Sequence, residues 1–414
     1  MLNSFYSFGI RLFGFSSYVA SMFQPKAAAW LEGRTSWRNA FEGFSKVNKL
    51  VWIHCASVGE FEQARPIIEK LKAGQPCQVV VTFFSPSGYE VRKNYPLADV
   101  VCYLPLDLRS NARSFFDVVK PDVALFIKYD FWFNFMQILN ERKIPSAVVS
   151  AYLPNNHWLL HFPGSLLVKR LAQFDKLFLQ DDQTKLNLEK FEIPNLEVVG
   201  DTRVDRVLEN KEQDFSSDII QSFSESHQVV VVGSNWPEDD ELLFSTIKES
   251  RDLKWIVAPH QIEDKQLSKW RSTLGKDVLF WSEIQDSSYT PELGRKVLLI
   301  DSIGLLSKLY RFADLAYVGG GFGAAVHNTL EAAVYHIPVL FGPNNQRFLE
   351  IQDLKRLEVG FEITSEHELK QTLKKALSDT DLRNRASHHA ESYFSIQKGA
   401  SVKVLDWVNT VLAN

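Results

Sequence analysis

From Leu50 onward, short β-branched runs alternate with amphipathic stretches, and this alternation constrains the fold more than any other feature. The pattern is typical of parallel sheets whose faces are covered by helices. The runs form two sets, separated by a polar stretch at 201–228. The predicted strands are 51–54, 79–83, 100–104, 123–127, 147–151, 177–179 and 197–199 in the first set, and 229–232, 255–258, 278–280, 297–300, 315–318, 339–341 and 361–363 in the second.

A chain of 414 residues is long enough to bury two cores. We therefore predict two similar α/β domains at 50–205 and 229–381, joined by a hinge at 206–228 and followed by a helical segment at 382–414. Paired domains of this kind hold a ligand between the carboxyl ends of two facing sheets. Each domain should therefore contribute strand-end residues to one cleft.

Residues 1–49 differ from the rest and predict a membrane-associated segment. Apolar side chains recur at steps of three and four residues, which gives a helix one stripe suited to the boundary between lipid headgroups and acyl chains: Phe5, Phe8, Leu12, Phe15 and Val19. The uninterrupted run of about twenty apolar residues that a transmembrane helix needs is absent. Basic residues outnumber acidic ones by six to two in 1–50, so anionic lipid would attract this segment. A cleaved signal peptide and an ordinary packed helix are the alternatives.

Charge and cysteine content argue against two classes of function. The formal net charge of −4 gives no field that would attract nucleic acid. Cys55, Cys77 and Cys102 are odd in number and lack a Cys-x-x-Cys pairing. We expect reduced core thiols and neither a zinc site nor a disulfide framework.

One turn in the first half carries a carboxylate. Small residues lead from the strand at 51–54 into Ser57-Val58-Gly59-Glu60, at a strand-to-helix turn where open α/β sheets do chemistry. Ser-x-x-Glu is also a capping box, in which both side chains bind orphan backbone amides. The spacing alone leaves capping and catalysis open for Glu60.

A glycine-rich turn at 319–323 follows the strand at 315–318 in the second half. We predict a helix over 324–333 whose N-terminus, together with Gly320 and Gly321, holds a phosphate. The spacing also matches the dinucleotide fingerprint, but the next strand ends without an acid for a ribose, which disfavours a nicotinamide cofactor. Glu331 would share a helical face with His327 and Asn328 and hold ribose hydroxyls or a base edge, with an ordinary surface pair as the alternative.

Polar residues follow other strands of this half: Ser234 and Asn235, His260, and Asp301 with Ser302. Each could be a turn residue or a helix cap. Their clustering at strand carboxyl ends is what a nucleotide pocket requires.

Several motifs, in order along nearly the whole chain, resemble those of the 3-deoxy-D-manno-octulosonic acid (Kdo) transferases of lipopolysaccharide assembly. They are Ser57-Val58-Gly59-Glu60, the segments 82–88 and 103–107, Gly200-Asp201-Thr202-Arg203-Val204-Asp205, Val318-Gly319-Gly320-Gly321 and the segment 327–333. The resemblance implies a GT-B glycosyltransferase: two Rossmann-like domains facing a central cleft, with a membrane-associated N-terminal helix. By analogy with that fold, the 382–414 helix crosses back onto the first domain.

The same resemblance implies an activity and a set of roles. The activity is inverting transfer of Kdo from CMP-Kdo to a lipid A precursor of the lipid IVA type, at the cytoplasmic face of the inner membrane, with no cofactor and no metal. Glu60 becomes the general base, because the acceptor hydroxyl is a poor nucleophile until a carboxylate takes its proton. Donor binding falls to Arg203, Ser234, His260, Gly320, Gly321, His327, Asn328, Glu331 and Asn344, and the acceptor side to Ser57, Gly59, Lys128, Asp130 and Trp132.

The chain departs from the family pattern at three positions. Arg203 stands where many members have lysine. Pro259 stands where an arginine is common, so another cation must serve the donor or the donor is held less tightly. Lys128 replaces the first acid of a Glu-x-Glu pattern and leaves Asp130 as its carboxylate, so the acceptor could differ; a solvated strand-end charge is the alternative for Lys128.

Two other functions stay open. One is a transferase or epimerase that acts on another nucleotide sugar, and the other is a membrane-peripheral nucleotide- or lipid-binding protein.

Overall fold

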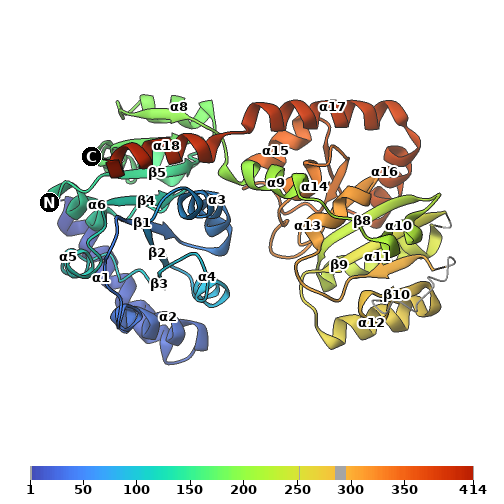
Figure 1. Ribbon diagram of the computed structural model, residues 1–414, viewed down its shortest axis with the longest axis horizontal. Helices are drawn as coiled ribbons and strands as arrows, with labels where there is room; N and C mark the ends of the chain where they lie inside the picture. The colour runs from blue at the N-terminus through green and yellow to red at the C-terminus, as the bar shows by residue number, and fades with distance from the viewer. Residues whose placement is uncertain (1, 251, 285–294, 414) are drawn as a thin grey trace. The chain divides into compact units, whose positions relative to one another are not determined.

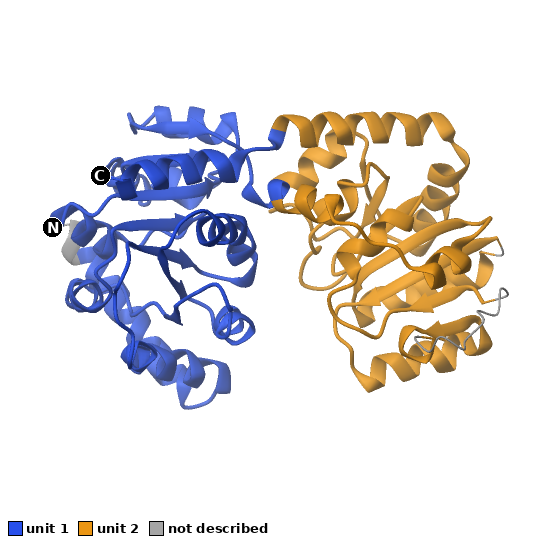
Figure 2. Ribbon diagram, in the orientation of Figure 1, with its two compact units in different colours: residues 1–205, 397–414 blue, residues 206–396 orange. Residues whose placement is uncertain are grey.

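The computed structural model describes residues 2–250, 252–284 and 295–413. The chain divides into two compact units, of which unit 1 comprises Met1–Asp205 with Gln397–Asn414, and unit 2 comprises Arg206–Ile396 (Figures 1 and 2). Each unit is built on a seven-stranded sheet. The two α/β domains predicted from the sequence pattern are thereby confirmed.

The sheet of unit 1 has the order β3-β2-β1-β4-β5-β6-β7, and all its pairs are parallel. Every residue of β1, β2, β4 and β5 is buried, because helices cover both faces. The strands are β1 (Leu50–Cys55), β2 (Gln78–Phe83), β3 (Val100–Tyr103), β4 (Val123–Ile127), β5 (Ser146–Ala151), β6 (Lys176–Leu179) and β7 (Leu196–Val198).

The two faces of this sheet are covered by different helices. On one face, the aromatic rings of α5 and α6 pack against Trp52 of β1. On the other face, α3 and α18 pack against Ile53 and its neighbours. The helices of unit 1 that follow the N-terminal segment are α3 (Val58–Gly74), α4 (Pro86–Arg92), α5 (Arg109–Val119), α6 (Phe133–Glu141), α7 (Ser165–Val168), α8 (Asp182–Glu189) and α18 (Ala400–Ala413).

The sheet of unit 2 has the order β10-β11-β9-β8-β12-β13-β14, again wholly parallel. One face packs on α11 (Pro237–Glu249), α12 (Asp264–Leu274) and α16 (Glu366–Ser378), around Trp255 and Trp270. The strands are β8 (Gln228–Asn235), β9 (Leu253–Pro259), β10 (Val278–Phe280), β11 (Val297–Leu299), β12 (Leu315–Val318), β13 (Val339–Phe341) and β14 (Gly360–Glu362), and the shorter helices are α13 (Leu306–Leu309), α14 (Leu330–Ala333) and α15 (Leu349–Arg356).

Each sheet has one topological switch point. The order of strands reverses between β1 and β4 in unit 1, and between β8 and β12 in unit 2. At a switch point the loops after two neighbouring strands leave in opposite directions, and ligands of open α/β sheets bind there. The four segments that matter for function are therefore those that follow β1, β4, β8 and β12.

The segment expected as a hinge is helical. Residues 206–228 carry most of α9 (Thr202–Glu212) and all of α10 (Asp218–Ser224). Within this polar stretch, Ile220 and Phe223 are buried and hold α10 in place.

The chain ends in two helices where one was expected over 382–414. α17 (Thr380–Gln397) and α18 are separated at Gly399, whose φ of 95° suits glycine. The carboxylate of Asp205 accepts hydrogen bonds from the backbone amides of Gly399 (2.5 Å) and Ser401 (2.6 Å), which satisfies the start of α18. α18 then packs on the sheet of unit 1.

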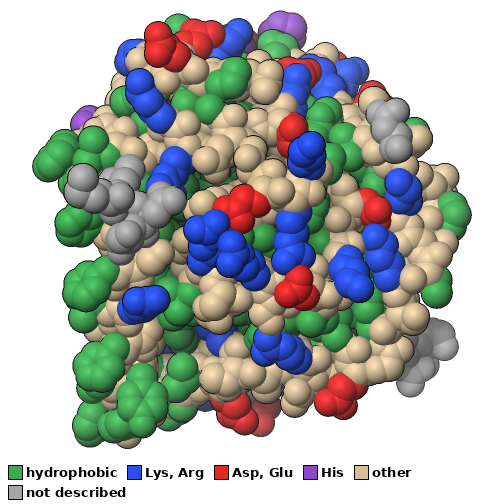
Figure 3. Space-filling model, turned by 90° about the vertical axis from the view of Figure 1, so that its left-hand side faces the viewer, with side chains coloured by type: hydrophobic (Ala, Val, Ile, Leu, Met, Phe, Trp, Pro, Cys, Tyr) green, Lys and Arg blue, Asp and Glu red, His purple; other side chains and the backbone are tan. Residues whose placement is uncertain are grey.

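The N-terminal segment forms α1 (Leu2–Ser21) and α2 (Pro25–Thr35). One face of α1 is tied to the domain, because Tyr6 donates a hydrogen bond to Asp107 (2.7 Å) and its ring packs edge-to-face on Phe133. Over the residues that the structure describes, no helix has the length and apolar character needed to cross a bilayer. Figure 3 views the molecule from the left-hand side of Figure 1 and shows hydrophobic side chains gathered along one edge of that face.

Candidate active site

The turn after β1 holds Glu60 by its backbone and its side chain together. Ser57 is the N-cap of α3, and its hydroxyl accepts a hydrogen bond from the amide of Glu60 (3.4 Å). The carboxylate of Glu60 in turn accepts a hydrogen bond from the amide of Ala56. The predicted capping box is therefore half formed, because Ser57 caps the helix while the carboxylate of Glu60 binds the amide of Ala56, one residue before the N-cap. Capping by Ser57 is confirmed. It does not exclude a chemical role, because the same contacts fix the carboxylate at the switch point.

The carboxylate of Glu60 lies in an environment that favours its protonated form. Its side chain is almost fully buried, and loss of water together with the negative charge of Asp130 raises its pKa to about 8. The amide of Ala56 and the positive charge of Lys128 act in the opposite direction and only partly offset this shift. A strongly perturbed carboxyl group at a switch point is a mark of a functional site.

Asp130, which follows β4, is the centre of a partly buried polar cluster. Its Oδ2 lies 2.7 Å from Nε2 of His54 and accepts a hydrogen bond from Nε1 of Trp132 (2.9 Å). The other ring nitrogen of His54 lies 2.8 Å from the hydroxyl of Thr82. The structure thus brings the predicted acceptor-side residues Asp130 and Trp132 together. It adds His54, a fully buried strand-end residue to which sequence reasoning gave no role.

Lys128 directly follows β4 and has a left-handed backbone conformation, with φ of 65°. This conformation is uncommon for a residue with a side chain; it costs free energy and persists only where the surrounding structure imposes it. Its charge acts on two buried acids, since it lowers the pKa of both Glu60 and Asp201. Gly59, also assigned to the acceptor side, lies in the first turn of α3 between Ser57 and Glu60.

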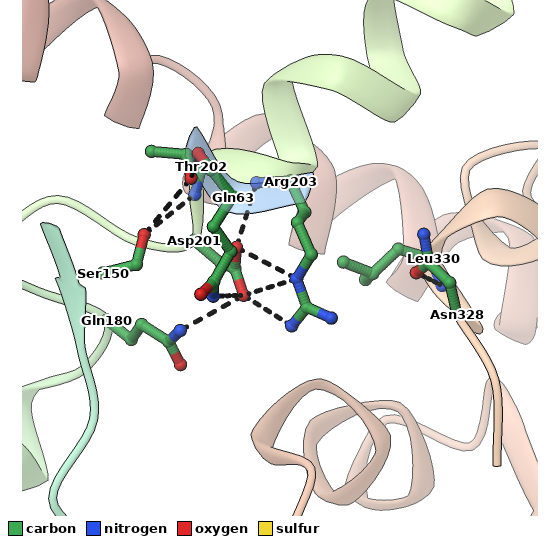
Figure 4. Close-up of polar contacts among 8 residues, drawn as sticks. All are labelled: Gln63, Ser150, Gln180, Asp201, Thr202, Arg203, Asn328 and Leu330. Atoms are coloured by element: carbon green, nitrogen blue, oxygen red, sulfur yellow. Dashed lines mark hydrogen bonds and ion pairs between the residues drawn. The ribbon is translucent and has the colours of Figure 1, made fainter. Parts of the chain in front are cut away.

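Arg203 is fixed by a neighbouring acid. Its guanidinium donates to Oδ2 of Asp201 from Nη2 (2.6 Å) and Nε (3.0 Å), and the side-chain amides of Gln63 and Gln180 bind the same oxygen (Figure 4). Burial raises the pKa of Asp201, but the charge and hydrogen bonds of Arg203 outweigh burial and hold that pKa below its usual value. This is a satisfied buried ion pair at the start of α9.

The glycine-rich turn after β12 differs from the expectation. No helix begins at Ala324: the next helix, α14, starts at Leu330 and has four residues. Two backbone hydrogen bonds keep this segment from forming a helix. The amide of His327 donates to the carbonyl of Gly319 (3.1 Å), and the amide of Val326 donates to the carbonyl of Asn344 (3.3 Å). A long helix dipole behind the turn, as the sequence suggested, is therefore absent from this part of the described chain.

The glycines themselves allow three strand ends to pack closely. A side chain at Gly321 would meet the backbone of Gly342 after β13, and one at Gly319 would meet the backbone of Asn235, the last residue of β8. Gly320 has φ of 91°, and its amide already donates to the carboxylate of Asp239 (3.0 Å). The expected phosphate cradle therefore cannot use the amide of Gly320 without breaking this bond.

Three stacked rings lie at the switch point of unit 2. His260, after β9, stacks on His327 with ring centroids 4.2 Å apart and on Trp236 at 4.6 Å. Nε1 of Trp236 donates to Nε2 of His327 (2.7 Å), so that nitrogen carries no proton. Loss of water and the neighbouring His260 lower the pKa of His327 to about 4, and partial desolvation also lowers the pKa of His260. His327 is therefore neutral at physiological pH, and the lowered pKa of His260 favours its neutral form as well.

The remaining predicted donor residues of unit 2 lie in the segments at the ends of β8, β12 and β13. Ser234 is the penultimate residue of β8 and has a left-handed φ of 54°. The side-chain amide of Asn344 donates to the carbonyl of Gly323 (2.7 Å) and so shapes the glycine-rich loop. The side-chain amide of Asn328 donates to Glu331 (3.1 Å), and its carbonyl oxygen accepts a hydrogen bond from the amide of Leu330, the first residue of α14 (3.2 Å; Figure 4). The expected pairing of His327 with Glu331 on one helix face is wrong, because His327 precedes the helix.

Two further residues at this site were missed by sequence reasoning. Trp236 gives no signal beyond its position one residue after β8. Arg347, in the loop after β13, is exposed and donates from Nη2 to the carbonyl of Ala324 (2.9 Å), beside the glycine-rich turn. Within the described ranges, no cluster of three or more His, Cys, Asp or Glu side chains is arranged to hold a metal ion.

A sequence model and several curated relatives that match this chain carry the same family description. The sequence model described as 3-Deoxy-D-manno-octulosonic-acid transferase (kdotransferase) matches residues 29–206. The 3-deoxy-D-manno-octulosonic acid transferase of Chlamydia trachomatis serovar D is 30% identical over 374 residues, which cover 85% of this chain and 81% of that protein. The enzyme of the same name from Aquifex aeolicus is 27% identical over 345 residues, with 81% and 88% covered. A bifunctional glycosyltransferase/methyltransferase of Fusobacterium nucleatum is 23% identical over 384 residues, and the chain spans only 58% of its length.

Solved structures share the fold at low identity. A UDP-GlcNAc 2-epimerase from Neisseria meningitidis superposes with a TM-score of 0.60 at 15% identity and covers 88% of this chain and 100% of its own. MurG from Acinetobacter baumannii gives 0.55 at 13%, with 87% and 99% covered. At these identities the likeness concerns the fold alone, which is of the GT-B type. With 30% identity to a relative over most of both chains, the protein belongs to the 3-deoxy-D-manno-octulosonic acid (Kdo) transferase family.

Proposed function

We propose that this protein transfers Kdo from CMP-Kdo to a lipid A precursor, with inversion at the anomeric carbon, in lipopolysaccharide core biosynthesis. Family membership supports Kdo transfer. The observation that carries the chemistry is Glu60, a buried carboxylate of raised pKa at the switch point of unit 1. Its position and its basicity are those expected of a general base.

The proposed reaction is a single displacement. The hydroxyl oxygen of the acceptor forms a bond to the anomeric carbon of Kdo while the carboxylate of Glu60 takes its proton. The bond from that carbon to the phosphate oxygen of CMP breaks, and its electron pair leaves with CMP. A pKa of about 8 makes this carboxylate a stronger base than an ordinary glutamate. The same pKa leaves it mostly protonated at neutral pH, so the reaction should accelerate in mild alkali.

The proposed donor site uses unit 2. The neutral rings of Trp236, His260 and His327 offer stacking surface and hydrogen-bonding nitrogens to the cytidine. Because these rings carry no charge, the phosphate requires a separate cation. Arg347 beside the glycine-rich turn is our candidate for the arginine expected at Pro259. Arg203, oriented by Asp201, is proposed as a second positive group.

The proposed location is the cytoplasmic face of the inner membrane, with α1 lying on the lipid. Phe5, Phe8 and Phe15 are 64–73% exposed on this helix. Replacing these three residues with serine should abolish cosedimentation with anionic vesicles. Phe162, which is 82% exposed elsewhere in unit 1, provides the matched control Phe162→Ser. Equal binding by the triple variant and the control would reject α1 as the anchor.

The activity is tested by mass spectrometry of products formed from a lipid A precursor. With CMP-Kdo the acceptor mass should increase by at least one Kdo residue, with equimolar release of CMP. UDP-linked sugars are the control donors, because the fold is shared with UDP-GlcNAc 2-epimerases. Turnover of a UDP-sugar without turnover of CMP-Kdo would replace the proposal with the alternative of another nucleotide sugar.

A further inference from the structure

Unit 1 contains an apolar groove that the proposed chemistry does not use. It has a volume of about 660 Å³ and lies among α1, α2 and α4. Its lining is mostly apolar and includes Phe13, Ala20, Ala29, Trp30 and Pro86. This volume is within the range of about 300–1,000 Å³ found for sites that hold organic ligands. The lining favours hydrocarbon over sugar.

A chain of aromatic rings connects the groove wall to the polar cluster of the candidate active site. Trp30 contacts Phe84 edge-to-face, with ring centroids 5.6 Å apart, and Phe84 stacks on Trp132 at 4.9 Å and 23°. Trp132 in turn donates a hydrogen bond to Asp130, whose charge acts on Glu60. The groove and the proposed base thus belong to one continuous packed structure within unit 1.

A buried cation fixes this connection. The guanidinium of Arg34 lies 3.6 Å from the ring centroid of Trp30 and 4.4 Å from that of Phe84, and its nitrogens donate to the backbone carbonyls of both residues. Burial lowers the pKa of Arg34 to about 9, but it remains charged at neutral pH. The rings between the groove and the polar cluster are therefore held in a defined geometry.

We propose that this groove binds one acyl chain of the acceptor lipid while the acceptor sugar lies at Glu60. The inference rests on the proposed function and extends it to the lipid part of the substrate. Phe13 lines the groove from α1, the helix that exposes Phe8 and Phe15, so an acyl chain can pass from the lipid surface into the groove. Lys26 and Glu90 also line it; Glu90 forms an ion pair with Lys93 (2.6 Å), whereas over the described residues the structure records no ion pair for Lys26. A lysine at an apolar groove is complementary to an amphiphile that carries phosphate.

The direct test fills the groove. Ala29→Trp should lower the ratio of kcat/KM for an acylated acceptor to kcat/KM for the same acceptor without its acyl chains at least tenfold. Thr35→Trp, which adds an indole at an exposed position of α2 outside the groove, should leave this ratio within twofold. An unchanged ratio in Ala29→Trp would overturn the proposal. An unchanged ratio with weaker vesicle binding would show that the groove holds a bilayer phospholipid instead.

A second measurement does not depend on turnover. A fatty acid brominated along its chain should quench tryptophan fluorescence of the full-length protein, and both Trp30→Phe and Ala29→Trp should reduce this quenching. If the unsubstituted protein transfers no Kdo, the proposed function fails, while quenching still reports whether the groove binds an acyl chain. Absence of quenching in a protein that transfers Kdo would reject the groove and leave the proposed function intact.

Discussion

The two switch points of this protein have the same topology and opposite chemistry. In unit 1, the segments after β1 and β4 place the charges of Asp130 and Lys128 close enough to Glu60 to act on its carboxylate. Burial and Asp130 outweigh Lys128, so the pKa of Glu60 rises to about 8. In unit 2, the segments after β8 and β12 bring neutral rings together, and the pKa of His327 falls to about 4. Glu60 therefore titrates near physiological pH, whereas His327 does not.

This difference indicates a division of labour. A group that moves a proton needs a pKa near the working pH, whereas a binding surface needs fixed, uncharged groups whose affinity does not vary with pH. Substitutions in unit 1 should therefore lower kcat without weakening CMP binding. Substitutions in unit 2 should weaken CMP binding without changing the pH dependence of kcat.

The largest effect is expected from Glu60→Gln, which keeps the shape of the side chain and removes the base. We expect kcat to fall by about 10²–10⁴-fold, the usual contribution of a general base. The Kd for CMP, measured by calorimetry, should stay within threefold. Glu62→Gln on the same helix is the control, because Glu62 pairs with Arg92 and Arg65 at the surface. Comparable losses in both variants would remove the distinction between the two glutamates.

The next effect concerns the ring stack of unit 2. His327→Ala removes a stacking ring and the acceptor of the Trp236 hydrogen bond. We expect the Kd for CMP to rise about fivefold, in keeping with about 1 kcal/mol for an aromatic contact. The pH dependence of kcat should not change. A shifted pH dependence with intact CMP affinity would show that proton chemistry extends into unit 2.

A thermodynamic effect should follow from the buried acid. The pKa of Glu60 is about 8 in the folded protein and near 4.5 in an unfolded chain. Between these values the unfolded chain releases a proton that the folded protein keeps, so this group lowers stability as pH rises from about 4.5 to about 8. Glu60→Gln should therefore be more stable than the unsubstituted protein at pH 9, by a few kcal/mol, and equal to it at pH 4. Urea unfolding at both pH values measures the difference, and a pH-independent difference would contradict the raised pKa.

The smallest effect is expected at Arg347. Arg347→Met removes an exposed cation beside the glycine-rich turn and should raise the Kd for CMP about threefold, with kcat nearly unchanged. The effect should shrink at high salt, because exposed charges are screened. Arg356→Met, at an exposed position on α15, is the control. Equal affinity of the two variants for CMP would leave the substitute for the arginine expected at Pro259 unidentified.

The strands could be predicted from sequence because β-branched runs bounded by turn residues have few other structures available. All fourteen predicted strands are present within a few residues of their expected ends. The role of Ser57 as a helix cap could also be predicted, because the Ser-x-x-Glu pattern contains both the hydroxyl of Ser57 and the amide of Glu60 that it binds. The raised pKa of Glu60 could not be predicted from sequence, because it depends on burial of the side chain and on Asp130, which lies seventy positions away in the chain.

The glycine-rich segment shows where local pattern fails. Residues 324–333 read as helical, yet hydrogen bonds from Val326 to Asn344 and from His327 to Gly319 hold most of them in a loop. These are long-range contacts that no local propensity encodes. His54 and Trp236 were missed for the same reason: each lies at a strand end, but its partners come from distant segments.

The pH dependence of kcat/KM for Kdo transfer tests the central claim most directly. For the unsubstituted protein the account predicts a rise with pH and a plateau above about 8, because Glu60 must be ionised to take a proton. Asp130→Asn removes a negative charge that raises this pKa, so its midpoint should move to lower pH, and Lys128→Met should move it to higher pH. Three profiles with one common midpoint would contradict the assignment of Glu60 as the base.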